Sequence, residues 1–400
     1  MRDRRADPPG ATRSALRLAY VFDERFPTSE TDAEQVVRTV DALARAGADV
    51  ELVVPRPLWG PAPSLRTLAD GYGLREPRFR VRALLSVGRS GRALEKPGHS
   101  VRAATHLAGG RCDLVYTRNL PSLFALLAAG FRVAYETYRP WHRELPRLLG
   151  RALPAAMAHP DFVGAILHSE YARDAFLEAG VAADRLEVVH NGFDPAHFEP
   201  PLSPERARSE LGIGARGPVA LYAGRMTLAK GVGAIVEMAR SAPEVDFVLV
   251  GAETDEIARD SRGLENVTVV PWVAPHRLPR YLYAGDVLIV PPTLDPLHRV
   301  GNTVLPMKLF SYLAAGRAIL APRAPDTSEL LRHGDNAFLV EPDDPAAATS
   351  ALATLVADAE LRSRLAAGAR ASAERLTWEH RAERVLRFLE TRLASGGGVG

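Results

Sequence analysis

Short apolar runs alternate along the chain with segments whose apolar residues recur at helical spacing. The first run, residues 16–22, is followed by Thr31-Asp32-Ala33-Glu34, a pattern typical of a helix start. Apolar residues three and four positions apart then continue to Gly47, and a second apolar run covers residues 50–54. A strand, a helix and a strand in this order predict two parallel strands joined by a crossover, the unit of an α/β fold.

The same alternation continues through most of the chain. Further strands are predicted in the first half at residues 113–116, 132–136, 163–168 and 186–189. After a proline-rich stretch around Pro195 to Pro204, strands are predicted at residues 219–222, 247–250, 267–270, 287–290, 318–320 and 338–340. From Pro345 onward the pattern is helical.

These patterns predict two doubly wound, Rossmann-like α/β domains facing a central cleft. A chain of 400 residues exceeds the roughly 250 to 300 residues at which single cores stop growing. We expect an N-terminal domain over 16–198 and a C-terminal domain over 199–376. A helix over 377–394 should follow, and residues 1–15 and 395–400 should be flexible tails. Ligands are expected at the carboxyl ends of the parallel strands.

Composition and charge narrow the class of protein. With 46% apolar and 24% charged residues the chain has the composition of a globular protein. Its net charge of +2 argues against a general nucleic-acid binder, so no nucleic-acid partner is expected. There is no apolar run long enough to span a membrane, no signal peptide is recognisable, and Cys112 is the only cysteine. We therefore expect a cytoplasmic protein.

Two features of the sequence resemble ligand sites but are interpreted as structural. Gly212, Gly214 and Gly217 form a G-x-G-x-x-G pattern, yet they precede a predicted strand instead of following one, so a dinucleotide fingerprint is not expected. Asp343 and Asp344 stand just before a predicted helix, where carboxylates cap the helix and offset its dipole. No His or Cys cluster has metal-ligand spacing, and neither a metal nor a cofactor is expected.

The segment after the first strand of the second half has the features of a diphosphate site. Gly224 lets the backbone approach a ligand closely, and a helix that opens near Gly231 directs free N–H groups at the same place. Arg225 and Lys230 add two positive charges. The sequence therefore predicts that Arg225 and Lys230 bind a diphosphate.

A second segment, residues 301–308, opens the helix that ends at Gly316. Pro306 fits its first turn, and we expect a phosphate-bearing ligand to be bound by amides and side chains of Asn302, Thr303, Val304, Leu305 and Lys308. Only three of the 50 basic residues are lysines, and Lys230 and Lys308 both belong to these two segments. A compact ammonium suits a phosphate contact where a planar guanidinium does not fit.

These motifs resemble those of the retaining glycosyltransferases of family 4, which have the two-domain GT-B fold. Gly224-Arg225 and Lys230-Gly231 match the donor-diphosphate pair of that family at the same spacing. The resemblance covers nearly the whole chain and includes residues 191–194, 308–316 and 378–379. It implies transfer of a sugar from a nucleotide-diphosphate sugar, which is a substrate and not a cofactor, to an unidentified acceptor. It also implies retention at the anomeric carbon without a required metal, and a final helix that crosses back onto the N-terminal domain.

The resemblance also assigns roles to the domains and to individual residues. The N-terminal domain would be acceptor-binding and the C-terminal domain nucleotide-sugar-binding, with residues 302–305 and Lys308 at the donor. Ser311 would contact the ribose, and the loop at Trp272 and Val273 would meet the base. Tyr138 or His142 would face the transferred sugar, and Arg225 and Lys230 would stabilise the leaving diphosphate.

The chain departs from the family pattern at three places. Two glutamates that the family often carries eight residues apart are Thr303 and Ser311 here. A hydroxyl replaces only part of the hydrogen bonding of a carboxylate. A histidine beside the reacting sugar is replaced by Tyr138, with His142 four residues further on. The glycine pair after the first strand is replaced by residues 27–30, Pro-Thr-Ser-Glu.

Residues 75–151 are strongly basic, with 15 Lys and Arg against 5 Asp and Glu. Four arginines in this stretch recur every fourth residue, so on one helix they would form a basic stripe: Arg139, Arg143, Arg147 and Arg151. Such a stripe could bind the anionic inner face of a membrane or a lipid-phosphate acceptor, or it could be a solvated or crevice-lining face. Pro140, Pro146 and Pro154 argue against one long regular helix.

Two other functions remain open from the sequence. The missing glutamates allow a catalytically silent sugar-nucleotide-binding or scaffold subunit that activates a partner enzyme. A sugar-nucleotide epimerase of similar architecture is the third possibility, although no carboxylate or histidine constellation supports it.

Overall fold

The computed structural model describes residues 15–28, 31–59, 61–86, 95–251, 255–300 and 305–395. The chain divides into two compact units. Unit 1 consists of Met1–Glu136, Ala152–Ile166 and Ala382–Gly400, and unit 2 of Thr137–Arg151 and Leu167–Arg381. The expected tails, apart from Ala15 and Ser395, lie outside the described residues.

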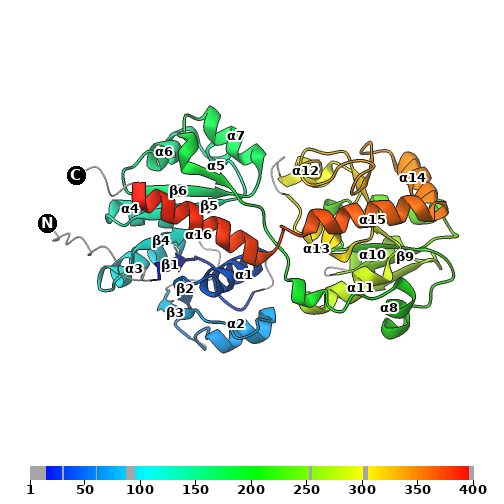
Figure 1. The fold of residues 1–400 in the computed structure, drawn as a ribbon, viewed down its shortest axis with the longest axis horizontal. Helices are drawn as coiled ribbons and strands as arrows, with labels where there is room; N and C mark the ends of the chain where they lie inside the picture. Colours follow the sequence, from blue (N-terminus) through cyan, green and yellow to red (C-terminus); the bar gives the residue numbers. More distant parts are fainter. Residues whose placement is uncertain are drawn as a thin grey trace. The chain divides into compact units, whose positions relative to one another are not determined.

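The first sheet has seven parallel strands in the order β3-β2-β1-β4-β5-β6-β7, drawn from blue to green in Figure 1. The reversal of strand order between β1 and β4 is the switch point at which doubly wound sheets bind ligands. The strands are β1 (Arg17–Val21), β2 (Asp49–Arg56), β3 (Arg80–Leu85), β4 (Leu114–Thr117), β5 (Val133–Thr137), β6 (Phe162–Leu167) and β7 (Leu186–Val188).

Helices connect these strands as the apolar periodicity predicts. They are α1 (Thr31–Arg45), α2 (Leu65–Tyr72), α3 (Glu95–Ala108), α4 (Leu120–Ala128), α5 (Trp141–Glu144), α6 (Arg147–Met157) and α7 (Glu170–Glu178), followed by the short η1 (Ala183–Arg185). The chain continues with η2 (Pro195–His197) and α8 (Pro204–Leu211). Gly212, at φ +66°, caps α8 and precedes the next strand, so the G-x-G-x-x-G pattern is structural as interpreted.

The second sheet has six parallel strands in the order β10-β9-β8-β11-β12-β13. They are β8 (Val219–Ala223), β9 (Asp246–Val250), β10 (Val267–Val270), β11 (Val287–Ile289), β12 (Ala318–Pro322) and β13 (Phe338–Val340). Between and after them lie η3 (Leu228–Lys230), α9 (Val232–Ser241), α10 (Asp255–Asp260), η4 (Pro275–Arg277), α11 (Leu278–Ala284), α12 (Asp295–Val300), α13 (Lys308–Ala315), α14 (Pro345–Ala357), α15 (Ala359–Ala373) and α16 (Trp378–Ser395).

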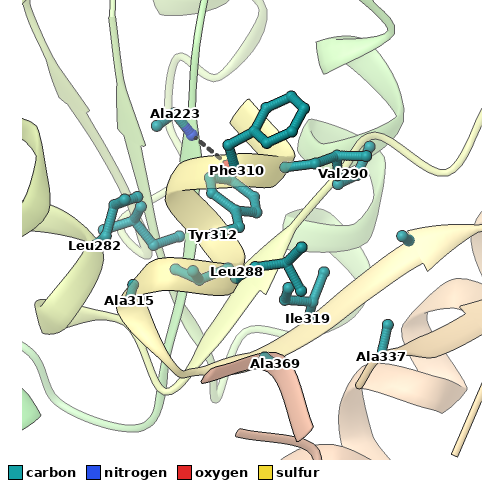
Figure 2. Packing of buried hydrophobic residues seen from close by; sticks show 14 of the residues in the cluster. Ala223, Leu282, Leu288, Val290, Phe310, Tyr312, Ala315, Ile319, Ala337 and Ala369 are labelled. Atoms are coloured by element: carbon teal, nitrogen blue, oxygen red, sulfur yellow. Dashed lines mark hydrogen bonds between the residues drawn. The ribbon is translucent and has the colours of Figure 1, made fainter. Parts of the chain in front are cut away.

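Helix α13 packs its apolar face on the second sheet. Figure 2 shows Phe310 and Tyr312 of α13 among side chains of that sheet, including Leu288 and Ile319. The Tyr312 hydroxyl accepts a hydrogen bond of 2.8 Å from the Ala223 amide at the end of β8. This contact places the start of α13 beside the carboxyl end of β8.

The carboxyl-terminal part of α16, Ala382 onward, belongs to unit 1. Buried Val385 and Leu389 lie one helical turn apart, as expected for the inner face of an amphipathic helix. The Arg392 Nε donates to the Val163 carbonyl on β6, 3.1 Å away. The red helix of Figure 1 is therefore an integral part of that unit.

The apolar runs located the strands to within one or two residues, but β3 was missed. Its arginines Arg80 and Arg82 are exposed and pair with Asp49 and Glu51 on β2. An edge strand with charged outward residues has no continuous apolar run, so the pattern that reveals buried strands does not detect it.

The basic stripe requires residues 139–151 to form one helix, and they do not, because Leu145 is extended and Pro146 separates α5 from α6. The four arginines therefore do not share one continuous helical face. The prediction that Pro306 lies in the first turn of the following helix is wrong. That helix begins only at Lys308, and Pro306 precedes it, accepting a turn hydrogen bond from Leu309.

Among the described residues, no helix has the length and apolarity needed to cross a membrane.

Candidate functional site

Two glycines meet at the carboxyl edge of the second sheet. Gly224 follows β8 with φ +151° and Gly251 follows β9 with φ +154°, both in the region that favours glycine. A Cβ added to Gly251 would collide with the Gly224 carbonyl oxygen. The Gly224 amide donates to the Val250 carbonyl at 2.9 Å, extending the ladder between β8 and β9. Only glycines allow these two turns to lie so close.

The turn after β8 carries Arg225. The Tyr222 hydroxyl donates to the Arg225 carbonyl at 2.8 Å, which fixes the backbone of the turn. The Tyr222 side chain is fully buried, and burial raises the pKa of its hydroxyl, so it stays protonated and remains a donor. Arg225 itself is partly exposed.

Lys230 ends η3, directly before α9. The Leu228 amide donates to the Glu256 carboxylate of α10 at 2.9 Å, which anchors the start of η3. Gly231, at φ +74°, then turns the chain into α9 without a side-chain cap. The Lys230 side chain is exposed and lies at this helix start. Arg225, Lys230 and the first turn of α9 therefore follow one strand end, as predicted.

Lys308 approaches the same turn from α13. Its Nζ lies 4.0 Å from the centre of the Tyr222 ring. A Cβ on Gly224 would lie 3.1 Å from that Nζ, so Lys308 is directly beside the glycine turn. Burial, together with the charge of Lys230, lowers the pKa of Lys308 to about 7. Lys230 and Lys308, which belong to two separate sequence segments, are thus close enough for the charge of one to act on the other.

The two aspartates ahead of α14 have different partners. Asp344 caps α14 by accepting from the Ala347 amide at 2.9 Å, as interpreted from the sequence. Asp343 instead accepts from the Thr293 hydroxyl at 2.5 Å and from the Leu294 amide at 3.1 Å. It therefore orders the loop after β11, whose Thr293 packs against Gly231.

The remaining predicted donor residues are partly described. Leu305 is buried, and Ser311 is partly buried on α13, one turn beyond Lys308. Asn302, Thr303 and Val304 lie outside the described residues. After β10, the Trp272 side chain is 59% exposed and free to meet a ligand. Val273, beside it, packs partly on the core of the second sheet.

Tyr138 and His142 follow β5 of the first sheet. The Arg139 guanidinium lies 5.2 Å from the Tyr138 ring centre and forms an ion pair of 3.1 Å with Glu144. The His142 ring lies 4.8 Å from the Phe176 ring, and burial, followed by the charge of Arg143, lowers its pKa. His142 is therefore neutral at physiological pH and packs on α7.

Of the other arginines in the expected stripe, Arg143 forms an ion pair with Glu178 of α7. Arg147 and Arg151 are exposed on α6. Arg139 and Arg143 are thus partly neutralised by their ion pairs. A paired charge attracts an anionic surface less than an unpaired one, so the expected stripe is weakened at these two positions.

A buried polar cluster in unit 1 was not predicted. Glu136, at the end of β5, accepts from the Tyr20 hydroxyl at 3.0 Å and from Gln35 at 2.5 Å. The Gln35 side-chain oxygen accepts from Arg118 at 2.6 Å. Desolvation and the Glu136 charge raise the pKa of Tyr20, which stays a donor. The only sequence signal was polar residues ending the apolar runs of β4 and β5.

A second polar group lies at the ends of β1 and β4 in the same unit. Asn119 Nδ2 donates to the Asp23 carboxylate at 2.6 Å, and Lys96 lies 3.5 Å from it. Lys96 also binds Glu24 at 2.7 Å. Burial raises the pKa of Asp23 to about 6. Charged and polar side chains thus line the carboxyl edge of the first sheet at its switch point. Within the described ranges, no group of three or more His, Cys, Asp or Glu side chains could hold a metal ion.

Comparison with known proteins agrees with this arrangement. Residues 33–197 match the family described as Glycosyltransferase Family 4, and residues 217–358 match Glycosyl transferases group 1. The chain is 30% identical over 315 residues to alpha-maltose-1-phosphate synthase of Mycolicibacterium smegmatis, covering 72% of this chain and 77% of that protein. It is 27% identical over 374 residues to D-inositol 3-phosphate glycosyltransferase of Xylanimonas cellulosilytica, covering 86% of this chain and 88% of that protein.

Solved structures show the same fold. Sucrose-phosphate synthase from Thermosynechococcus elongatus has a TM-score of 0.75 at 18% identity, covering 95% of this chain and 100% of that one. Anabaena Alr3699/HepE in complex with UDP has a TM-score of 0.72 at 19% identity, covering 94% and 100%. The fold is GT-B, with two Rossmann-like α/β domains. The chain belongs to the glycosyltransferases of family 4 and group 1.

Proposed function

We propose that the protein is a retaining glycosyltransferase that requires no metal and moves a sugar from a nucleotide-diphosphate sugar to an acceptor hydroxyl. The observation that carries this proposal is the set of basic residues at the carboxyl end of β8. Arg225 and Lys230 follow the glycine turn on one side, and Lys308 lies beside it on the other. Such a site offers charge where a leaving diphosphate needs it.

The role of these residues follows from the charge that develops in the reaction. When the bond between the anomeric carbon and the diphosphate oxygen breaks, negative charge grows on the diphosphate. Arg225, Lys230 and the amides at the start of α9 stabilise that charge, which lowers the barrier without metal. Ser311 contacts the ribose, Trp272 and Val273 meet the base, and residues 302–305 contribute to donor binding. Tyr138 faces the transferred sugar, because His142 packs against Phe176 of α7.

The acceptor binds at the carboxyl edge of the first sheet in unit 1. The relatives named above are an inositol-phosphate glycosyltransferase and a maltose-phosphate synthase. These names support a phosphorylated polyol or sugar as the class of acceptor to test. The excess of basic over acidic residues in 75–151 favours an anionic acceptor.

The test is release of nucleoside diphosphate from UDP-, GDP- and ADP-sugars in the presence of EDTA, with a panel of sugar and polyol phosphates. We expect turnover with one donor, loss of turnover in Arg225→Ala, and a product whose anomeric configuration, read by NMR, equals that of the donor. Tight donor binding with neither transfer nor hydrolysis across the panel would contradict the proposal and favour a silent binding subunit. An inverted product or inhibition by EDTA would contradict the proposed mechanism.

A further inference from the structure

Lys308 differs from the other two basic residues of the site in its surroundings. Arg225 and Lys230 lie on the loop after β8, whereas Lys308 is the first residue of α13 and lies against the buried ring of Tyr222. Its Nζ is next to Gly224, the residue at which a ligand can come closest to the backbone. A group bound on the glycine turn therefore lies within reach of this amine.

Of the described groups that face Lys308, only the aromatic ring of Tyr222 favours a positive charge on it. From β8 it faces the neutral phenol of Tyr222, and from η3 the positive charge of Lys230 acts on it. On its own helix, the Tyr312 hydroxyl is engaged with the Ala223 amide and the Ile289 carbonyl. Among the described residues no carboxylate forms an ion pair with Lys308. The aromatic face compensates only a small part of the lost hydration.

The sequence of α13 explains why this charge has no partner. Ser311 lies three residues after Lys308, on the same side of the helix. A carboxylate at that position could reach the ammonium, but the serine hydroxyl carries no charge to offset it. The amine is therefore poised between its two protonation states near neutral pH, as its pKa of about 7 also indicates.

We propose that Lys308 takes up a proton from solvent when a nucleoside diphosphate binds on the Gly224 turn, and then holds the diphosphate as an ammonium. This inference rests on the proposed function of the site. The bound phosphate oxygens supply the negative charge that the free site lacks, and they raise the proton affinity of the amine. Above neutral pH, donor binding and proton uptake are therefore coupled, with up to one proton gained for each nucleotide bound.

The chain permits a direct test because it has only three lysines, Lys96, Lys230 and Lys308. Protein labelled with ¹³C-lysine gives three Cε signals, and the Lys308 signal is the one missing from Lys308→Arg. Titration from pH 6 to pH 10 should show this signal titrating at about 7 in the free protein. With saturating UDP, or GDP where that is the nucleotide bound, its midpoint should move above about 9, because an adjacent opposite charge favours the ammonium. Inorganic pyrophosphate should produce the same shift.

Calorimetry of nucleotide binding at pH 8 in buffers of different ionisation enthalpy provides a second measurement. The parent should show an enthalpy that depends on the buffer, with most of one proton taken up. Lys308→Arg, which is charged throughout, and Lys308→Met, which cannot bind a proton, should show no such dependence. Lys230→Met should reduce the proton uptake in part. Without the Lys230 charge, Lys308 is already more protonated before the nucleotide binds.

Different outcomes separate this inference from the proposed function. A Lys308 signal that titrates near 10.5 in the free protein, or nucleotide binding that leaves its midpoint unchanged, overturns proton uptake and leaves the donor site intact. A protein whose lysine signals respond to no nucleoside diphosphate or pyrophosphate overturns the donor site, and the coupling with it.

Discussion

The Nζ of Lys308 lies over the ring of Tyr222, 4.0 Å from its centre, and the same Tyr222 donates its hydroxyl to the Arg225 carbonyl. One buried aromatic side chain thus supports two of the three basic residues of the site. The ring places the lysine beside Gly224, and the hydroxyl fixes the turn that carries the arginine. The site is therefore organised by the end of β8 before any ligand binds, which reduces the ordering cost of binding.

Removal of either loop cation should weaken nucleotide binding. We expect Arg225→Ala and Lys230→Ala each to lose about 1.5 to 3 kcal/mol in the binding free energy of a nucleoside diphosphate, the size of a charge-assisted hydrogen bond. Isothermal titration measures the loss. Arg240→Ala is the matched control, since Arg240 lies at the other end of α9 and pairs with Asp260. Equal affinity of all three variants and the parent would refute the diphosphate assignment.

The glycine contact at the edge of the second sheet should be required for both stability and binding. In Gly251→Ala the new Cβ meets the Gly224 carbonyl, so the two turns must separate. We expect a loss of about 2 kcal/mol or more in the free energy of unfolding and at least tenfold weaker nucleotide binding, because backbone collisions cannot be relieved by side-chain rotation.

Gly263→Ala is the control for this substitution. Gly263 also has positive φ, +88°, but a Cβ there would meet nothing within 4 Å. The free energy of unfolding of this variant should fall by only about 1 kcal/mol, the cost of backbone strain, and its nucleotide affinity should be unchanged. If the two alanine variants bind nucleotide equally well, close approach of Gly224 and Gly251 is not needed for the site.

Most of the fold could be predicted because buried parallel strands are short apolar runs between glycines and polar turns. The runs predicted for β8 and β11, 219–222 and 287–290, each end within one residue of the strand end in the structure. The contact between Lys308 and Tyr222 could not be predicted, since it depends on how α13 packs on the sheet through Phe310 and Tyr312. Local sequence carries no signal for such a tertiary contact.

The polar residues of unit 1 were missed for a related reason. Glu136 is completely buried, yet a single glutamate at the end of an apolar run is equally compatible with an exposed strand end. Its burial becomes understandable only when Tyr20 and Gln35, from two other elements, supply hydrogen bonds. The arginines of 139–151 show the limit of regular spacing as a signal, because a shared helical face requires one continuous helix and Pro146 separates α5 from α6.

Lys308 should decrease the stability of the free protein. Its pKa is about 7 in the folded chain and near the ordinary value of 10.5 when unfolded. Below pH 7 both states are charged and folding bears the full desolvation cost. Between pH 7 and pH 10.5 the unfolded chain binds more protons than the folded chain, so the free energy of unfolding rises with pH. Lys308→Met should therefore be more stable than the parent by about 1 to 3 kcal/mol below pH 7, with the difference vanishing near pH 10.

Thermal unfolding of parent and variant at pH 6, 8 and 10 measures this difference. Lys308→Arg is the control, because a guanidinium stays charged over the whole range and should bring no pH-dependent gain. A Lys308→Met variant that is less stable than the parent at pH 6 would show that the amine contributes favourable contacts that exceed its desolvation cost.

Ser311 tests the donor site at the ribose. A serine hydroxyl offers the ribose a neutral hydrogen bond, worth about 1 kcal/mol, where a carboxylate would contribute about 1.5 to 3 kcal/mol. Ser311→Ala should therefore weaken UDP binding by tenfold at most and leave pyrophosphate binding unchanged, since pyrophosphate has no ribose.

Ser311→Glu should tighten UDP binding at pH 8 and raise the titration midpoint of Lys308, because the two side chains lie one turn apart. Ser311→Gln, which has the same reach without charge, should leave the midpoint unchanged. If Ser311→Glu binds UDP more weakly than the parent while Ser311→Ala loses more than tenfold, α13 positions the nucleoside differently and the ribose assignment is wrong.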